Sequence, residues 1–493
     1  MLTLLLLLPA AAIVSILFKA PPKGAALLAS GANLLWSLGL ALQYIPQGTG
    51  RYQFEENTLW ASLPGLPPIH YHLGLDGINL PLVLLATLVT FAAVWVTPAG
   101  ITRSREFFGY VLLISLGIIG AFLSLDLFFL YIFHEFALLP TFLLIGIWGT
   151  QNRQFASLQL TLYLTLGSLI LLAGIIALVV AMPEAARTFD LTNLAVIAPV
   201  LHDGAYVWPA FPMAGGPLIF SLLLIGCGML VSLVPFHTWA PPGYASAPPA
   251  ASMLHAGVLK KFGLYVLLRV AWPLFPDVAN HCQELLVGLV LAHIFYVGFI
   301  TLAQKELPTM LGYSSVMHMG YLFLGLISWD KIGLAGLVLL MVAHGLSTAT
   351  LFALSGEIEA RTGTVRFEEL GGLAKKAPFL ATLFVIASMA ALGLPGLPNF
   401  AGELLIFFGA WRAHPFVVAL VLWGSVMTAT YFLRAVRSVC FGPLPEKFAQ
   451  LTDLKTASER APYLLLAAAM LFLGLAPGVL LRWITASLPP TPY

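Results

Sequence analysis

The sequence predicts an all-α integral membrane protein with about 14 transmembrane helices, and two observations carry this prediction. First, hydrophobic residues make up 60% of the 493 residues and charged residues only 9%, whereas soluble domains carry roughly 25% charged residues. Second, the apolar residues fall into separate runs, most of them close to the ~20 residues that a helix needs to cross a bilayer. The formal net charge of +2 is too small to favour a nucleic acid as a partner.

The predicted spans follow these apolar runs in order. The first run, MLTLLLLLPAAAIVSILF, lacks the positive residues that precede the core of a signal peptide, so we expect a transmembrane helix there. The spans lie at residues 2–18, 25–45, 77–97, 107–124, 127–148, 157–182, 217–236, 252–272, 284–303, 308–327, 333–355, 378–396, 414–433 and 461–482.

The distribution of basic residues predicts the orientation of these spans. The loops after the odd-numbered spans hold most of the 23 lysines and arginines. Because basic loops mark the cytoplasmic side, we expect both termini on the outer side. Two long polar insertions, residues 46–76 and 183–216, then also fall on the outer side, and their sequence does not fix the kind of surface element they form.

Prolines interrupt two of the apolar runs. Pro235 breaks span 7 in VSLVPFHTW, and Pro395 and Pro398 break span 12 in LGLPGLPNFAGE. The two breaks lie five spans apart, so the second would be inverted in the membrane relative to the first. Paired interrupted helices in inverted halves indicate an ion path near the membrane midplane.

Two adjacent lysines, Lys260 and Lys261, lie in the middle of span 8, in HAGVLKKFGLYVLLR. One central lysine costs about 2.5–3.5 kcal/mol on insertion scales. Neighbouring residues point about 100° apart on a helix, so at most one faces a given interior stripe squarely. The structural alternative is that one of them snorkels to the surface. Their depth favours a function for at least one, because burial disfavours the charged form of a lysine and so suits a proton carrier.

Two glutamates also lie deep in apolar sequence. Glu135 follows His134 in IFHEFALLP, and Glu403 follows the second break in PNFAGELLIFF. An intramembrane carboxylate is a functional candidate, since its charge depends on its neighbours. For Glu403 the structural alternative is a contact with a helix dipole, worth about 0.3–1 kcal/mol.

Histidines form the third group of candidates. His318 and His344 lie in consecutive spans near Ser and Gly, which favours a hydrogen-bonded relay with water. His237 follows the first break and is a further candidate, whereas His255 fits packing equally well. Four acidic residues near span ends are more simply interpreted as solvated helix caps: Asp76, Asp126, Glu357 and Glu359.

The sequence contains no motif for a redox centre or a nucleotide. No phosphate-binding glycine loop occurs, and no histidine pair has the spacing of a haem or metal site. The three cysteines, Cys227, Cys282 and Cys440, lie far apart and are expected to be small apolar fillers. Energy would therefore have to come from another subunit.

Several of these segments resemble the proton-translocating antiporter-like subunits of respiratory NADH:quinone oxidoreductase (complex I), most of all chain M, also called chain 4. The similar segments run in the family's order along most of the chain: GLDGINLPLVLL, HEFALLPTFLLIGIWG, VPFHTWAPP, SAPPAASMLHAGVLKKFGLYVLLR, LGYSSVMHMGY, VAHGLSTATLF and LPGLPNFAGE. The resemblance implies two inverted five-helix repeats, helices 4–8 and 9–13, with helices 7 and 12 discontinuous. The chain would divide into residues 1–98, 107–272, 284–433 and 461–482.

The resemblance also implies roles for single residues. Glu135 matches the glutamate of helix 5, and Lys261 matches the lysine at the centre of the channel. Glu403 matches the helix 12 glutamate that faces the exit half. His318 and His344 match the histidines of the central hydrophilic axis.

Four sites depart from the family's pattern. The acidic segment that usually follows the helix 7 motif is PPGY at residues 241–244, and Pro308 replaces a lysine. Lys260 stands where the family usually has an apolar residue, and Val231 stands where it has the helix 7 lysine that pairs with the helix 5 glutamate. Three interpretations are open. Lys260 or His134 compensates, helix 8 pairs with Glu135 directly, or the subunit pumps weakly or not at all.

The sequence therefore predicts a proton-conducting membrane-arm subunit of NADH:quinone oxidoreductase in a bacterial inner (plasma) membrane. FMN, iron–sulfur clusters and quinone are expected in partner subunits and no cofactor in this chain. The expected partners are other membrane-arm subunits, chiefly the neighbouring antiporter-like ones, and the lipid bilayer. The alternatives are a subunit of a multi-subunit cation/proton antiporter or of a hydrogenase-type complex, or a structural paralogue that does not pump.

Overall fold

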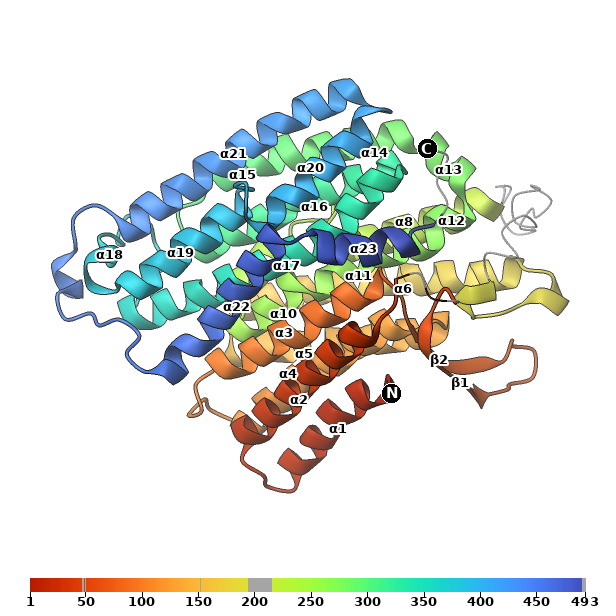
Figure 1. The fold of residues 1–493 in the computed structure, drawn as a ribbon, viewed down its shortest axis with the longest axis horizontal. Coiled ribbons are helices and arrows are strands. Elements are labelled where there is room, and N and C mark those ends of the chain that lie inside the picture. Colours follow the sequence, from red (N-terminus) through yellow and green to blue (C-terminus); the bar gives the residue numbers. More distant parts are fainter. Residues whose placement is uncertain (47, 49, 151, 194–214, 490–493) are drawn as a thin grey trace.

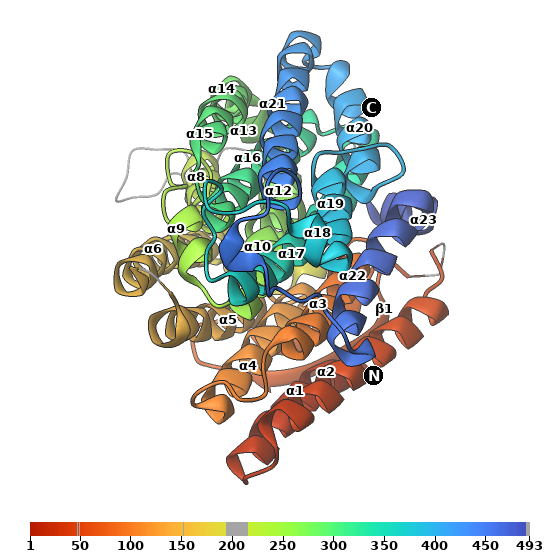
Figure 2. The same cartoon turned by 90° about the vertical axis from the view of Figure 1, so that its left-hand side faces the viewer.

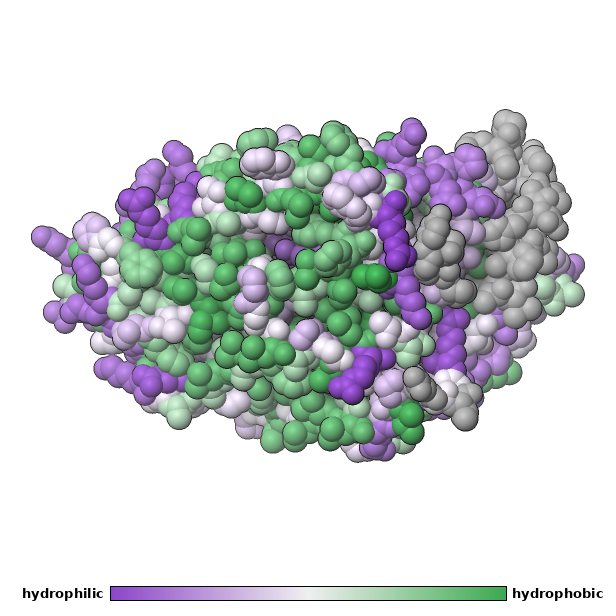
Figure 3. All heavy atoms as spheres, turned by 45° about the horizontal axis from the view of Figure 1, so that its top comes forward, coloured by the Kyte–Doolittle hydropathy of each residue, from purple (hydrophilic) through white to green (hydrophobic). Residues whose placement is uncertain are grey.

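The computed structural model describes the whole chain except residues 47, 49, 151, 194–214 and 490–493. It is a bundle of helices that run mostly side by side, with one two-stranded hairpin at one end (Figure 1). Within the described residues, eleven helices are long and apolar enough to cross a membrane, and three shorter apolar helices accompany them. On the face shown in Figure 3, hydrophobic residues cover the middle and hydrophilic residues gather toward the two ends. The predicted fold class, an all-α membrane protein, is confirmed.

The N-terminal part contains six long helices and the hairpin. The helices are α1 (Thr3–Leu17), α2 (Pro22–Gln43), α3 (Asn79–Val96), α4 (Ser104–Leu123), α5 (Leu127–Trp148) and α6 (Arg153–Ala181). The polar insertion 46–76, whose structure the sequence left open, contains the antiparallel strands β1 (Gln53–Ala61) and β2 (Ile69–Leu75). A single 3-10 turn, η1 (Glu184–Ala186), follows α6; the insertion predicted at 183–216 lies largely outside the described residues.

The first predicted break is present. Helix α8 (Gly215–Val231) ends before Pro235, and the chain resumes in α9 (Ala240–Ser246). The following span is less regular than predicted. It consists of α10 (Pro249–Gly257), the 3-10 turn η2 (Leu259–Lys261), α11 (Phe262–Val266), the π-helical η3 (Leu267–Ala271) and α12 (Trp272–Leu274). The single helix predicted at 252–272 is therefore interrupted at the two lysines.

The second part repeats the pattern of a proline-interrupted span. Its elements are α13 (Pro276–His281), α14 (Gln283–Ala292), the π-helical η4 (His293–Val297), α15 (Gly298–Ala303), α16 (Leu307–Ser328), α17 (Lys331–Thr362), α18 (Leu373–Lys376), α19 (Pro378–Ala391), α20 (Pro398–Trp411), α21 (Pro415–Cys440), the 3-10 turn η5 (Glu446–Phe448), α22 (Ala457–Leu475) and α23 (Gly478–Ser487). Proline stands in the first turn of α10, α16, α19, α20 and α21, where its missing N–H is not needed. The last span, predicted as one helix over 461–482, is instead divided at Pro477.

Both described ends of the chain lie at the end of the bundle that carries the hairpin. The N-terminal amine pairs with Glu56 of β1. Near the C-terminus, Ser487 of α23 accepts a hydrogen bond from the backbone N–H of Gly77, just after β2, at 2.8 Å. The two described ends are therefore on one side of the bundle (Figure 1), in keeping with the predicted even number of spans; that this side is the outer one stays a prediction.

The helices that carry the candidate lysines and histidines are the most enclosed in the bundle. Figure 2 looks along the bundle and shows α10 and α17 surrounded by the other helices. The most apolar windows of Pro249–Leu274 and of α17 are 100% buried, whereas those of α2 and α21 are 39% buried. Polar side chains on the two central helices therefore have only protein groups and internal water as partners.

An ionic clasp outside the spans holds the hairpin against the loop after α6. His72 of β2 lies 3.1 Å, Nδ1 to Oδ2, from Asp190 of that loop, and its Nε2 lies 3.7 Å from Glu55 of β1. Burial lowers the pKa of His72, but the hydrogen bond to Asp190 and the nearby carboxylates outweigh it, so that this pKa is raised. Burial raises the pKa of Asp190, but hydrogen bonds from His72 and Thr192 outweigh it and the net pKa is lowered.

We expect this clasp to loosen as the pH rises. Because the pKa of His72 is raised in the folded protein, protonated His72 stabilises the clasp fully at a pH below its pKa in the unfolded chain, about 6.5. This stabilisation is lost as the pH rises through the pKa of His72 in the folded protein. Because the pKa of Asp190 is lowered in the folded protein, ionised Asp190 stabilises the clasp at a pH above its pKa in the unfolded chain, about 3.9. That stabilisation is lost as the pH falls through the pKa of Asp190 in the folded protein. Amide hydrogen exchange of residues 69–75, corrected for intrinsic rates, should be slowest between about pH 4.5 and 6.5 and faster above it. A His72→Gln variant should show no such rise; an equal rise would assign it to another group.

Candidate functional site

The two lysines sit at an interruption in the most buried helix run. Lys260 is 1% exposed and Lys261 is fully buried. Helix α10 ends at Gly257, and Val258 leaves helical geometry with φ −124° and ψ −63° before the 3-10 turn that contains both lysines. A backbone carbonyl beside this interruption accepts a hydrogen bond from a lysine side chain: the Nζ of Lys261 donates to the carbonyl oxygen of Ala256 at 2.5 Å. The interruption thus supplies a ligand for a buried ammonium.

Close glycine packing brings this interruption against α17. A Cβ on Gly257 would lie 3.0 Å from the carbonyl oxygen of Gly345, and a Cβ on Gly345 would meet the carbonyl oxygen of Gly257. The two backbones can approach this closely only because both residues lack a side chain. Since Gly345 follows His344, the contact places the lysine turn near the histidine helix.

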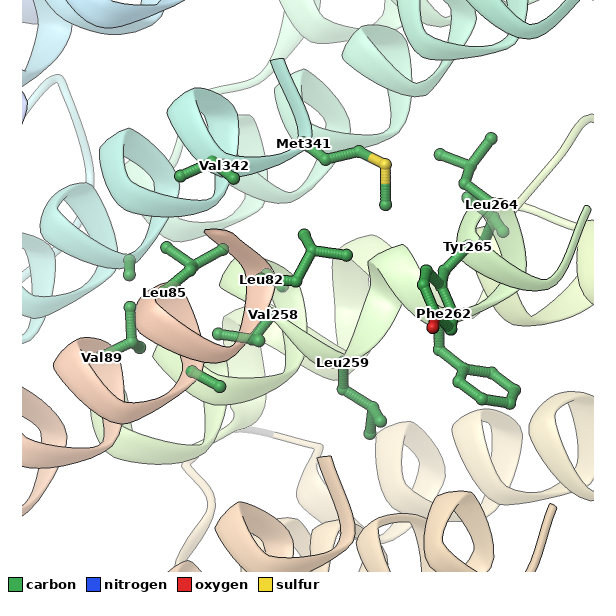
Figure 4. Close-up of a cluster of buried hydrophobic side chains, with 14 of the residues drawn as sticks. Leu82, Leu85, Val89, Val258, Leu259, Phe262, Leu264, Tyr265, Met341 and Val342 are labelled. Carbon is green, nitrogen blue, oxygen red and sulfur yellow. The ribbon is translucent and has the colours of Figure 1, made fainter. Parts of the chain in front are cut away.

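An apolar collar surrounds the lysine turn on its α3 side. Figure 4 shows Leu82 and Leu85 of α3 and Met341 of α17 gathered around Val258 and Phe262, which flank the lysines in sequence. All five are nearly or fully buried. These side chains bury apolar surface on this side of the lysines.

Lys260 points toward the second part of the chain. Its Nζ lies 3.4 Å from the Oγ of Ser315 on α16 and 5.6 Å from the centroid of the Tyr244 ring on α9. An ammonium above an aromatic face is stabilised by the ring quadrupole. Lys260 is therefore tied to α9 and α16 and makes no ion pair with any acidic residue in the described parts of the chain.

His318, His344 and Glu403 come together beside the break between α19 and α20. The His318 and His344 rings lie 5.1 Å apart, centroid to centroid. The Nε2 of His318 lies 3.9 Å from the Oε1 of Glu403. Three residues predicted from separate spans therefore form one buried cluster.

The hydrogen bonds of His318 suit a ring that can hold an extra proton. Its Nδ1 lies 2.8 Å from the carbonyl oxygen of Ser314, and its Nε2 lies 3.1 Å from the carbonyl oxygen of Ala391. Carbonyl oxygens only accept, so a neutral imidazole can donate to one of them and an imidazolium to both. Ala391 ends α19, so its carbonyl is available to the ring because of the break.

A small internal cavity adjoins this cluster. Its lining includes Ser314, His318, His344 and Thr348. The Nε2 of His344 lies 3.2 Å from the Oγ1 of Thr348, while its Nδ1 is buried without a hydrogen-bond partner among the described residues. Apolar residues, among them Leu311 and Leu351, line the rest of this cavity, and an internal water could join a relay on its polar side.

Glu135 lies apart from the lysines, near the surface of the bundle. Its side chain on α5 is 33% exposed, and it forms no ion pair with a lysine in the described chain. Its ionisable neighbour is His134, whose Nδ1 lies 3.6 Å from Oε1 of Glu135. The His134 ring stacks on Phe262, the residue after Lys261, with centroids 4.0 Å apart. Of the two compensating residues that the sequence suggested, this geometry favours His134 and not Lys260.

Val231 ends α8 and faces the helix that carries the lysines. Its Cγ2 would lie 2.5 Å from a Cβ on Gly263, two residues beyond Lys261. The side chain is fully buried. The position therefore adjoins the lysine turn but carries no charge.

Sequence reasoning missed His293, which anchors the first break. The Nε2 of His293 accepts from the backbone N–H of Val234 at 2.9 Å, and its Nδ1 lies 3.1 Å from the carbonyl of Val316. The nearby His237 instead contacts the ring of Tyr296, at 5.7 Å between centroids. His255 lies 3.2 Å, through Nδ1, from the hydroxyl of Tyr244. A lone histidine in an apolar run gave no signal for the anchoring role of His293.

The expectation of solvated caps is wrong for two of the four acidic residues. Asp126 caps α5 by accepting from Phe128 and Phe129, and Asp76 accepts from Ile78 and Asn79, but both side chains are fully buried. Asp76 also pairs with Arg269 of η3. Among the described residues, no group of three or more His, Cys, Asp or Glu side chains is arranged to hold a metal ion.

The fold and this site define a multi-helix membrane protein with ionisable groups buried between two interrupted helices. The chain belongs to the NADH:quinone oxidoreductase/Mrp antiporter transmembrane family, whose model matches residues 124–428.

Proteins similar to this chain come from several lineages. It is 33% identical to NADH-quinone oxidoreductase subunit M of Rhodobacter capsulatus, over 93% of this chain and 88% of the relative. It is also 33% identical to F(420)H(2) dehydrogenase subunit M of Methanosarcina mazei, over 92% and 91%. A chain of respiratory complex I from Thermus thermophilus, with bound NADH, superposes with a TM-score of 0.86 at 30% identity, covering 99% of each chain.

Proposed function

We propose that this chain is the M-type subunit in the membrane arm of an NADH:quinone oxidoreductase and that it conducts protons across the membrane. The family match and the subunit M relatives, which align over almost the whole chain, support this assignment. The observation that carries the proton-conducting role is the pair of buried lysines between two broken helices, close to a buried histidine–glutamate cluster. The antiporter and hydrogenase alternatives are not favoured by these relatives.

Lys261 is the proposed proton carrier. Burial penalises the charged form of a lysine, so small changes in the nearby charge decide whether it holds a proton. The Ala256 carbonyl stabilises the charged form, and the freed backbone around η2 lets the turn adjust. Proton uptake would come from the cytoplasmic side, the side predicted to carry the basic loops.

Glu135 is the proposed control residue. In our proposal quinone reduction elsewhere changes the electric field at Glu135, and His134 takes the part that a helix 7 lysine plays in the family. The stack of His134 on Phe262 links this pair mechanically to the turn that holds Lys261. A shift of charge between Glu135 and His134 would then alter the proton affinity of Lys261 over a short path.

Release would use the cluster beside the second break. The proton passes from Lys261 to the two histidines through internal water and then from His318 to Glu403. The two carbonyl acceptors around His318 support its protonated form during this passage. Lys260, held by Ser315 and Tyr244, would help to bridge the lysine turn to α16.

Other subunits would complete the machine. We propose that FMN, iron–sulfur clusters and quinone reside in partner chains and that neighbouring antiporter-like subunits flank this one in a bacterial inner membrane. The exposed leucines of α6, such as Leu158, Leu162 and Leu169, supply a surface for lipid or for such a neighbour. Both termini would lie on the outer side.

The test of this function is proton delivery by the intact complex. An affinity tag on this chain should purify an assembly that oxidises NADH with quinone. In proteoliposomes this assembly should create a pH difference that an uncoupler abolishes. If the tagged chain purifies with a complex that does not oxidise NADH, the assignment to NADH:quinone oxidoreductase is wrong.

We expect His134→Phe to reduce coupled activity. Phenylalanine keeps a ring on Phe262 but removes the group that faces Glu135, so NADH oxidation and proton delivery should both fall by about three- to tenfold, or ~0.7–1.4 kcal/mol. His414→Phe, at the start of α21 and outside the residues of the proposed path, is the control. Wild-type proton delivery in His134→Phe would exclude His134 as the substitute for the missing lysine.

A further inference from the structure

A second buried charged pair lies at the hairpin end of the bundle, outside the path described above. The Nη2 of Arg269, in η3, donates to the Oδ1 of Asp76, which precedes α3. The Arg269 side chain is 4% exposed and that of Asp76 is fully buried. Removing two such charges from bulk water costs several kcal/mol for each ion unless other polar groups compensate.

The protein compensates only part of this cost. The Oδ1 of Asp76 also accepts from the backbone N–H groups of Ile78 and Asn79, at 2.9 and 3.0 Å. The Oδ2 of Asp76 and the Nε and Nη1 of Arg269 are buried and have no hydrogen-bond partner among the described residues. Open donors and acceptors on one buried ion pair form a site suited to ordered water, which typically makes two to four hydrogen bonds.

The same helix run connects this pair to Lys261. Lys261, Tyr265 and Arg269 follow one another at intervals of four residues, which places them near one face of the run. The guanidinium carbon of Arg269 lies 5.3 Å from the centroid of the Tyr265 ring. The Tyr265 hydroxyl donates to the carbonyl of Phe122 at 3.1 Å. Tyr265 is therefore the polar residue one turn beyond Lys261 on the same helix run, and its ring contacts Arg269.

Apolar side chains close the remaining space. Figure 4 shows Tyr265 next to Leu264 and Phe262, with Leu82 and Met341 nearby. These side chains are nearly or fully buried. A hydroxyl can carry a proton across such a layer, because it can accept one proton and donate another.

We propose that Asp76 and Arg269 bind a cluster of ordered water that forms the outer end of a second proton-release branch, reached from Lys261 through the Tyr265 hydroxyl. This inference rests on the proposed function of Lys261. In the transfer the hydroxyl leaves the Phe122 carbonyl, its oxygen accepts a proton from the lysine side, and its own proton passes to the water. Tyr265 is neutral before and after the step. The protonated water beside Asp76 then gives its proton to the outer surface.

The competing explanation is that the ion pair only clamps the structure. Gly77, next to Asp76, donates to Ser487 of α23, and Ser487 lies 3.2 Å from the hydroxyl of Tyr44. A Cβ on Gly77 would collide with the backbone of Trp483. The region therefore does join α2, α3 and α23, and a test must separate clamping from proton release.

The matched variants are Tyr265→Phe and Tyr44→Phe in the intact complex. Each removes one buried hydroxyl at the hairpin end, but only Tyr265 lies one turn beyond Lys261 on the same helix run. We expect Tyr265→Phe to keep the assembly and to lower the protons delivered per NADH, by at most about twofold, because this branch carries only part of the proton flux. Tyr44→Phe should match the wild type. An equal number of protons per NADH in Tyr265→Phe and Tyr44→Phe would overturn the proposal of a second release branch.

Two further measurements keep the outcome distinct. Radiolytic hydroxyl-radical labelling in H2(18)O should mark Tyr265 beside bound water more strongly than the similarly buried Tyr244, whose hydroxyl lies 3.2 Å from the Nδ1 of His255. No label on Tyr265 would overturn the water site. Lys261→Met, measured in parallel, tests the proposed function on which this inference rests. Normal proton delivery in Lys261→Met would refute Lys261 as the proton carrier. Reduced delivery in Lys261→Met, together with a wild-type number of protons per NADH in Tyr265→Phe, would refute only the second release branch.

Discussion

Replacing Lys261 with methionine should abolish most coupled turnover while leaving the protein folded. Methionine has a similar length and no charge, and the position is fully buried. Replacing a buried charge with an apolar group of similar volume is often neutral or stabilising for folding. The loss should therefore appear in function, as a fall of about tenfold or more in proton delivery, equivalent to ~1.4 kcal/mol.

Lys260→Met is the matched control, because it removes the same charge one residue away. Its ammonium contacts Ser315 and Tyr244 and not the Ala256 carbonyl. We expect only a two- to threefold fall there, about 0.4–0.7 kcal/mol. Both variants should be compared by NADH oxidation, with and without uncoupler, and by acidification of proteoliposomes. The reverse order of effects would make Lys260 the carrier; wild-type values in both would refute the proton-conducting role.

The helices were predictable because hydrophobic burial in a bilayer leaves a strong local signal. A helix occurs at each predicted span, and the two proline breaks at Pro235 and Pro398 fall where the sequence placed them. Proline signals are local because the ring removes one donor and fixes one dihedral. The β1–β2 hairpin was not predicted as such, because its strands of mixed polar and apolar residues resemble a polar loop.

The irregular winding around Lys261 was not predictable for a different reason. The sequence LHAGVLKKFGLYVLL contains no proline and reads as a continuous helix. The interruption coincides with the approach of Gly257 to Gly345, which are 88 positions apart in sequence and meet only in the folded bundle. Contacts of this kind override helix propensity.

Polar partners were predictable only where they came from recognisable motifs. His318, His344 and Glu403 were named together from the sequence, and they are neighbours in the structure. Asp76 and Arg269 were not paired, since Asp76 was interpreted as a solvated cap and Arg269 was not singled out. Their burial depends on the hairpin and on α23 covering them, which neither local sequence shows.

The break between α19 and α20 offers a way to displace Glu403 without changing it. Gly393 and Gly396 both have left-handed backbone, with φ +79° and +87°. Alanine at either position should destabilise the left-handed backbone by a similar amount, roughly 1 kcal/mol. A Cβ on Gly393 would lie 2.7 Å from the Oε2 of Glu403, whereas a Cβ on Gly396 would meet nothing within 4 Å.

We therefore expect Gly393→Ala to push the Glu403 carboxylate out of place and to lower proton delivery by about three- to tenfold, ~0.7–1.4 kcal/mol, while Gly396→Ala stays near the wild type. Glu403→Gln, which keeps the shape of the side chain but cannot ionise, should lower it at least as much as Gly393→Ala. The measurement is protons delivered per NADH by assembled complex of equal subunit content. If both alanine variants deliver equally few protons per NADH, backbone strain in the break is the cause. If Glu403→Gln alone delivers the wild-type number, the carboxylate takes no part in release, and the proton must leave His318 through another group.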